Sequence, residues 1–117
     1  SQKIICVMGC GGNRDQEKRP KMGRIGCEYS DHLIITSDNP RDENPEVIIQ
    51  QIENGIAEED KKNYLSIVDR YQAIKTACMI SNVGDIILIA GKGHETYQEI
   101  KGVKTPFNDK LILKEIL

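Results

Sequence analysis

Four consecutive residues, Asp38, Asn39, Pro40 and Arg41, follow a short apolar run at residues 33–36 that is typical of a buried strand. In α/β sheets, ligands bind outside the carboxyl ends of the strands, so polar side chains at this point are candidates for chemistry. A carboxylate such as that of Asp38 can bind an ammonium group, and a guanidinium such as that of Arg41 can bind a carboxylate through two hydrogen bonds. The cluster therefore predicts a site for a zwitterionic ligand such as an amino acid.

A glycine-rich loop with the sequence Gly-Cys-Gly-Gly-Asn-Arg-Asp occupies residues 9–15, directly after an apolar run. It does not match the dinucleotide-binding fingerprint, which needs a glycine where Arg14 stands, and it lacks the Gly-Lys-Ser/Thr of a P-loop. One interpretation is a tight turn that uses glycine for its positive φ. Arg14 favours the other, a carboxylate or phosphate site, because a guanidinium beside exposed backbone donors binds such anions.

A third polar loop, Gly-Lys-Gly-His-Glu at residues 91–95, follows another apolar run. Glycines that flank a lysine can form a simple turn, and a lone histidine is more often structural than catalytic. The functional interpretation requires Glu95 and the carbonyl groups of this turn to face the other two loops. An ammonium group would then meet acceptors here, while Arg14 and Arg41 would hold carboxylates.

The remaining sequence alternates strand and helix patterns, which predicts an α/β domain with mostly parallel strands and an antiparallel hairpin near its end. Continuous apolar runs predict buried strands at residues 3–8, 33–36 and 86–90, the last being the clearest. Residues 97–100 and 103–107 predict the hairpin. Helices are expected where apolar residues recur at helical spacing: Met22, Ile25 and Tyr29; Ile48, Ile49, Ile52 and Ile56, after Asn44 or Pro45; Ala73, Ile74, Ala77 and Cys78, capped by Asp69; and Ile112, Leu113 and Ile116, capped by Asn108.

Two charged segments have simpler explanations than a ligand site. Lys18, Arg19 and Lys21 are interpreted as the solvated start of a helix, with an accessory anion contact as the alternative. Residues 58–62 are predicted to form a charged surface turn to which no function is assigned.

Length and composition bound the remaining possibilities. The chain has 117 residues, enough for one domain, with 38% hydrophobic, 29% charged and 4% aromatic residues. A net charge of −2 argues against nucleic acid as a partner, and no apolar stretch predicts a membrane span or a signal peptide. The four cysteines match no common zinc pattern, so we expect no metal site, and reduced cysteines indicate the cytoplasm.

In this order and spacing, the motifs at residues 9–15, 18–20, 22–23, 38–41, 91–95 and 97–98 resemble the C-terminal domain of the Mur ligases. The resemblance covers nearly the whole chain and is closest to the branch of the family that adds meso-diaminopimelate to a UDP-MurNAc-L-Ala-D-Glu precursor. It implies a Rossmann-like, three-layer domain in peptidoglycan synthesis. In such ligases ATP phosphorylates a carboxylate of the precursor, and the incoming amine attacks the acyl phosphate.

The resemblance also implies roles for six residues, all in substrate binding and none in catalysis. Arg14, Asn39 and Arg41 would hold the distal carboxylate of meso-diaminopimelate, and Asp38 belongs to the same selectivity motif. The carbonyl of Gly91 and the carboxylate of Glu95 would hold the distal ammonium.

The sequence matches the C-terminal part of the family only. ATP and Mg²⁺ are therefore expected in the full-length enzyme and not on this chain alone, and the UDP-MurNAc-dipeptide would bind through domains that are missing here. The family's first strand and helix of this domain are also expected to be missing, which would leave the domain incomplete at its N-terminal side. Two alternatives stay open: a standalone, non-catalytic amino-acid or precursor-binding module, and the lysine-adding or folylpolyglutamate branch of the superfamily.

Overall fold

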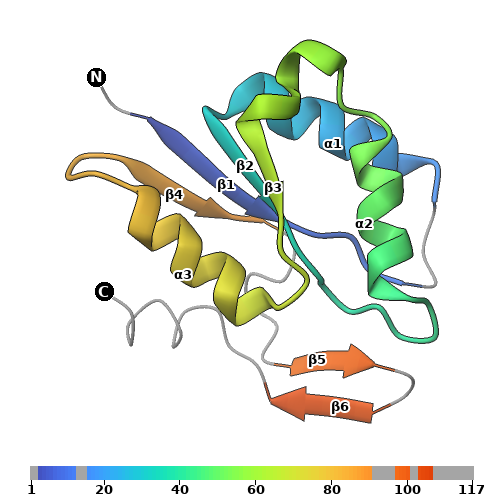
Figure 1. Cartoon of the computed structure of the whole chain (residues 1–117). Coiled ribbons are helices and arrows are strands. Elements are labelled where there is room, and N and C mark those ends of the chain that lie inside the picture. The colour runs from blue at the N-terminus through green and yellow to red at the C-terminus, as the bar shows by residue number, and fades with distance from the viewer. Residues whose placement is uncertain (1–2, 13–15, 91–96, 101–102, 107–117) are drawn as a thin grey trace.

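The computed structural model of the chain describes residues 3–12, 16–90, 97–100 and 103–106. Strands and helices alternate along most of this length, as the sequence predicts (Figure 1). In chain order the elements are β1 (Ile4–Met8), α1 (Lys18–Tyr29), β2 (His32–Ile35), α2 (Pro45–Glu53), the 3₁₀-helix η1 (Glu58–Asn63), β3 (Tyr64–Ser66), α3 (Arg70–Ile80), β4 (Ile86–Ile89), β5 (Tyr97–Ile100) and β6 (Val103–Pro106).

Four of the strands form a parallel sheet in the order β3-β2-β1-β4. The chain builds this sheet outward from β1 through β2 to β3, and then returns through α3 to place β4 on the other side of β1. Since the strands are parallel, their carboxyl ends lie at one edge of the sheet. In folds of this kind, the change of direction beside the first strand marks the usual position of a ligand site.

Helices cover both faces of the sheet, which gives three layers (Figure 1). On one face, α1 and α2 pack over side chains of β1 and β2, including Cys6 and Leu33. On the other face, α3 packs over Ile5, Val7 and Ile34. The predicted Rossmann-like α/β class is therefore confirmed.

Two helix starts follow directly from capping chemistry. The side chain of Asn44 accepts a hydrogen bond from the backbone N–H of Glu46 at 2.9 Å, with Pro45 as the first helical residue of α2. Asp69 caps α3 in the same way, accepting from the N–H of Gln72 at 3.1 Å. Both predicted caps are confirmed, and the predicted isoleucine stripe of α2 is buried.

Helix α1 has a different buried face from the one that apolar spacing suggests. Ile25 and Tyr29 are 47% and 75% exposed, while Gly23 and Gly26 are buried. A Cβ on Gly23 would lie 2.1 Å from the carbonyl oxygen of Ile52, so the backbone of α1 packs directly against α2. A pattern of large apolar residues cannot reveal a face that is buried because its residues are small.

The edges of the sheet also depart from the sequence predictions. Residues 58–62, predicted to form a charged surface turn, belong to the 3₁₀-helix η1. The short strand β3 that follows η1 was not predicted. Strand β4 was expected to be buried, yet Ile86 and Leu88 are 44% and 52% exposed. Within the described residues β4 is an edge strand of the sheet. The helices α1 and α2 cover β1 and β2 and leave side chains of β4 exposed.

The predicted hairpin is confirmed by β5 and β6, which pair antiparallel from Tyr97↔Pro106 to Ile100↔Val103. Its last predicted residue, Phe107, and the helix expected after Asn108 lie outside the described residues.

Candidate functional site

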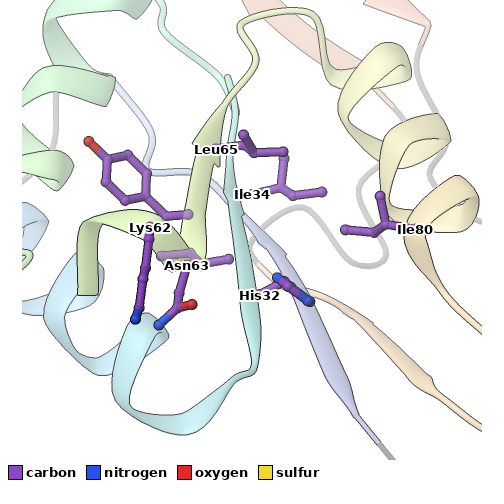
Figure 2. Close-up of a pocket in the computed structure, with 8 residues that line it drawn as sticks. His32, Ile34, Lys62, Asn63, Leu65 and Ile80 are labelled. Atoms are coloured by element: carbon purple, nitrogen blue, oxygen red, sulfur yellow. The ribbon is translucent and has the colours of Figure 1, made fainter. Parts of the chain in front are cut away.

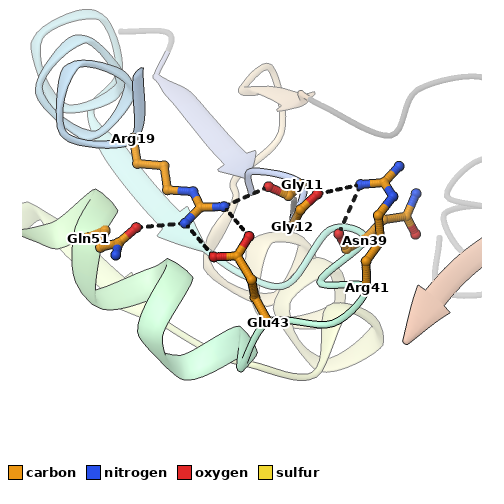
Figure 3. Close-up of polar contacts among 7 residues, drawn as sticks. All are labelled: Gly11, Gly12, Arg19, Asn39, Arg41, Glu43 and Gln51. Carbon is orange, nitrogen blue, oxygen red and sulfur yellow. Dashed lines mark hydrogen bonds and ion pairs between the residues drawn. The ribbon is translucent and has the colours of Figure 1, made fainter. Parts of the chain in front are cut away.

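The loops that follow β1 and β2 contact each other at the carboxyl edge of the sheet. The backbone N–H of Gly12 donates to the carbonyl oxygen of Asn39, and Arg41 donates from Nη1 to the carbonyl oxygen of Gly12 at 3.0 Å (Figure 3). Ala90, the residue before the third loop, lies at the same edge, because its N–H donates to the carbonyl oxygen of Val7 at 2.8 Å. The predicted convergence is thus confirmed for residues 9–12 of the first loop and for the second loop, and residues 91–95 of the third lie outside the described residues.

Arg41 has an unusual backbone conformation for its residue type. Its φ is 52°, and among the described residues no other non-glycine has a positive φ. Its guanidinium is held by two backbone carbonyls, since Nη1 also donates to Asn39 at 3.2 Å. A non-glycine residue whose backbone is in the left-handed region costs free energy and often marks a functional site. The loop therefore fixes both the backbone and the guanidinium of Arg41.

Gly12 is required by the close contact between the two loops. A Cβ at this position would lie 1.7 Å from the carbonyl oxygen of Pro40, a distance that no side chain can occupy. The N–H of Gly12 is already bonded to Asn39. The described part of this loop is therefore packed against its neighbour and does not form an open phosphate cradle.

Arg19, near the start of α1, contacts both loops, a role that its position in the sequence did not indicate. Its side chain was expected to be solvated, but it is only 1% exposed. Its guanidinium forms a forked ion pair with Glu43, with Nη1–Oε1 and Nη2–Oε2 distances of 3.1 and 2.8 Å. It also donates to the carbonyl oxygen of Gly11 at 3.0 Å and to the side chain of Gln51 at 2.6 Å.

The prediction of a solvated segment holds for its lysines only, because Lys18 and Lys21 are exposed. Figure 3 shows the guanidinium groups of Arg19 and Arg41 on opposite sides of the glycine-rich segment. No local pattern marks Arg19, because its acceptor Glu43 lies 24 residues away in the sequence.

A second buried arginine holds the loop after β2 from the other face of the sheet. Arg70, the first residue of α3, is 2% exposed and donates from Nη1 to the carbonyl oxygen of Ser37 at 3.2 Å. The hydroxyl of Thr36 adds a hydrogen bond to the carbonyl oxygen of Val68 at 3.2 Å. The chain leading to Asp38 and Arg41 is thus anchored on both sides.

Cys10 shows the electrostatic character of the space between the loops. Burial raises the pKa of its thiol, with the Arg19 cation opposing this increase and the Asp38 carboxylate adding to it. The thiol lies 3.4 Å from the sulfur of Met22. A raised pKa disfavours the thiolate form of Cys10.

The predicted site residues divide into two groups. Asp38, Asn39 and Arg41 lie at the expected edge of the sheet: Asp38 and Arg41 are partly exposed, and Asn39 is 2% exposed, with its carbonyl bonded inside the loop. Arg14, Gly91 and Glu95 lie outside the described residues.

Two hollows lie outside the contact between the loops. One of about 220 Å³ lies at the amino ends of β2 and β3, where its lining includes His32, Tyr64 and Ile80 (Figure 2). The other, of about 370 Å³, lies between α2 and β3. Neither is lined by Asp38, Asn39 or Arg41.

A search of the described residues for potential metal sites finds no cluster of three or more His, Cys, Asp or Glu side chains. Among those same residues, no helix is long and apolar enough to cross a membrane.

Comparison with known proteins gives consistent matches. The family model described as "Mur ligase, glutamate ligase domain" matches residues 1–93. Curated relatives from Cytophaga hutchinsonii, Bacteroides fragilis and Aquifex aeolicus are 61%, 59% and 57% identical over 117, 114 and 115 residues, which is 100%, 97% and 98% of this chain. All three are named UDP-N-acetylmuramoyl-L-alanyl-D-glutamate--2,6-diaminopimelate ligase.

A solved structure of a ligase with the same name superposes with a TM-score of 0.92 over 99% of this chain, at 42% identity. The chain spans 24%, 24% and 23% of the length of the three relatives, and 24% of the solved chain. The similarity therefore covers one domain of much longer proteins.

Proposed function

This chain belongs to the Mur ligase family, and from that premise we propose that it is the amino-acid-recognising domain of an ATP-dependent ligase that joins meso-diaminopimelate to UDP-MurNAc-L-Ala-D-Glu. The observation that carries the proposal is the fixed position of Arg41 at the carboxyl edge of the sheet, in a chain whose relatives are named for diaminopimelate.

The proposed selectivity depends on one difference between two amino acids. Diaminopimelate is lysine with an additional carboxylate at its far end. Arg41 is partly exposed, so we propose that the bound amino acid shields its guanidinium from water. With lysine bound, the shielded guanidinium would lack its anion, which is costly. Arg41 fits this role because two backbone carbonyls already orient its guanidinium.

The other predicted residues complete a site that binds the distal carboxylate through one set of groups and the distal ammonium through another. Arg14 and Asn39 would act with Arg41 on the distal carboxylate, and Asp38 would belong to the same loop. The carbonyl of Gly91 and the carboxylate of Glu95 would accept hydrogen bonds from the distal ammonium. The parallel pairing of β4 with β1 supports this assignment, since it places the end of β4, which precedes the third loop in the sequence, beside the end of β1.

The described part of the glycine-rich loop does not fit the triphosphate of ATP, because the carbonyl of Pro40 occupies the space beside Gly12 and the Gly12 N–H is bonded to Asn39. We therefore derive no phosphoryl-transfer step from this chain. ATP, Mg²⁺ and the UDP-linked precursor are proposed to bind to other domains of the ligase, which would act in the cytoplasm. We propose that the 117-residue chain alone has no ligase activity.

An assay of tripeptide formation tests the proposal. The full-length protein is supplied with ATP, Mg²⁺ and the UDP-linked dipeptide, together with meso-diaminopimelate, L-lysine or L-glutamate, and the product is identified by mass spectrometry. We expect a product with diaminopimelate, far less with lysine or glutamate, and none from the 117-residue chain alone.

Preferential use of lysine would instead indicate the lysine-adding branch. Glutamate addition in a parallel reaction, in which a folate replaces the UDP-linked dipeptide, would indicate the folylpolyglutamate branch. Binding without turnover by the full-length protein would indicate a recognition module. Product formation by the 117-residue chain alone would contradict the proposed division of labour between the domains.

A further inference from the structure

Arg19 connects three segments that are separate in the sequence. Its guanidinium bonds the carbonyl of Gly11 in the loop after β1, both carboxylate oxygens of Glu43 in the loop after β2, and the side chain of Gln51 in α2. The side chain is only 1% exposed, so these contacts are shielded from water. The start of a helix on the protein surface does not need a buried side chain that links three segments.

The contacts of Arg19 bear directly on the proposed site. Gly11 immediately precedes Gly12, whose carbonyl oxygen accepts a hydrogen bond from Arg41. Arg19 therefore holds the segment that Arg41 contacts. Glu43 lies two residues after Arg41, so the same guanidinium also holds the loop that carries Arg41.

We propose that Arg19 is a positioning residue: through Glu43 and Gly11 it sets the spacing between the Arg41 loop and the glycine-rich segment at residues 9–12, and thereby controls the affinity for the distal carboxylate of the amino-acid substrate. This inference depends on the proposed function. It assigns no contact between Arg19 and the substrate, since Nη1 and Nη2 of Arg19 are each engaged by two acceptors of the protein.

The geometry requires arginine and not merely a positive charge. A guanidinium is a planar fork that binds both oxygens of a carboxylate and still has donors for other acceptors, whereas a lysine ammonium is a single point of charge. Arg19 uses two nitrogens for Glu43, and each of them has a second acceptor. Lysine would keep the charge but lose the simultaneous link to all three segments.

Steady-state kinetics of the full-length ligase test the inference. The variants are Arg19→Lys and Glu43→Gln, with Arg24→Lys and Glu46→Gln as matched controls at exposed positions of α1 and α2. We expect Arg19→Lys and Glu43→Gln to raise the KM for diaminopimelate about tenfold, because small displacements of binding groups are costly. In these two variants the KM for ATP should stay within about twofold of the wild-type value. In the two control variants the KM values for both diaminopimelate and ATP should do the same.

The pattern across substrates separates positioning from a merely structural role. A structural defect would lower the fraction of active enzyme and hence kcat, leaving the KM for diaminopimelate unchanged, and that result overturns the inference. The double variant should be no worse than the more affected single variant, because both substitutions break one link. Fully additive effects would also count against it.

Two further outcomes are decided in advance. Where Arg19→Lys does not fold, the nearly isosteric Glu43→Gln decides the matter, and failure of both to fold assigns Arg19 to stability alone. Arg41→Ala in the same assay separates the two proposals. An unchanged KM for diaminopimelate in Arg41→Ala rejects the proposed function, whereas a raised KM in Arg41→Ala with an unchanged one in Arg19→Lys rejects only the positioning role.

Discussion

Arg41 in the loop after β2 donates from Nη1 to the carbonyl oxygen of Gly12 in the loop after β1, at 3.0 Å. The N–H of Gly12 bonds in return to Asn39, two residues before Arg41. These reciprocal contacts make the two loops one structural unit, with the backbone of Arg41 in the left-handed region at a φ of 52°. Hydrogen bonds within the protein therefore hold Asn39 and Arg41 in place.

Two glycines of α1 offer a matched test of how this helix packs. A Cβ on Gly23 would lie 2.1 Å from the backbone oxygen of Ile52, whereas one on Gly26 would lie 3.0 Å from the flexible ends of Leu33 and Met8. We expect Gly23→Ala to lower the free energy of unfolding by about 1–3 kcal/mol, as for other overpacked sites.

Gly26→Ala should change stability by less than about 1 kcal/mol, because the higher helix propensity of alanine offsets the tighter contact. Urea unfolding of both variants measures the difference. Equal stabilities would show that α1 does not depend on backbone contact with α2 at Gly23.

Asp85 should make stability depend on pH in the acid range. Its carboxylate accepts hydrogen bonds from the backbone N–H groups of Asn82, at 2.8 Å, and Lys3, at 3.1 Å, and these bonds lower its pKa. A lowered pKa in the folded state adds stability above the unfolded value of about 3.9, and this stability is lost as the pH falls through the folded pKa.

Thermal melts of the wild type and Asp85→Asn across the acid range should therefore differ most near neutral pH and converge below about pH 4. Glu59→Gln, at an exposed position of η1, serves as the control for the removal of one carboxylate. A difference between wild type and Asp85→Asn that stays constant with pH would contradict the role of the ionised carboxylate.

Features set by local chemistry could be predicted from the sequence. Asn44 and Asp69 were recognised as helix caps because their side chains bond to backbone groups a few residues away. The strands β1 and β2 were recognised from continuous apolar runs, and their parallel pairing placed the polar loops at one edge. The candidate residues Asp38 and Arg41 follow from that placement.

Features set by long-range packing could not be predicted. Arg19 resembles a surface cation until the fold brings Glu43 to it. The buried face of α1 is invisible to a search for large apolar residues, because Gly23 is buried through its lack of a side chain. The run that forms β4 resembles a fully buried strand, although Leu88 is 52% exposed, because burial depends on which helices cover the strand.

The most direct test of the central claim combines the loss of one side chain from the protein with the loss of one carboxylate from the ligand. Isothermal titration calorimetry of the ligase and its Arg41→Ala variant would measure binding of meso-diaminopimelate and of L-lysine, which lacks the distal carboxylate. We expect the substitution to weaken diaminopimelate binding by about 1.5–3 kcal/mol, as for a lost hydrogen bond to a charged group, and to change lysine binding far less. Equal losses for both amino acids, or no loss for diaminopimelate, would contradict the assignment of Arg41 to the distal carboxylate.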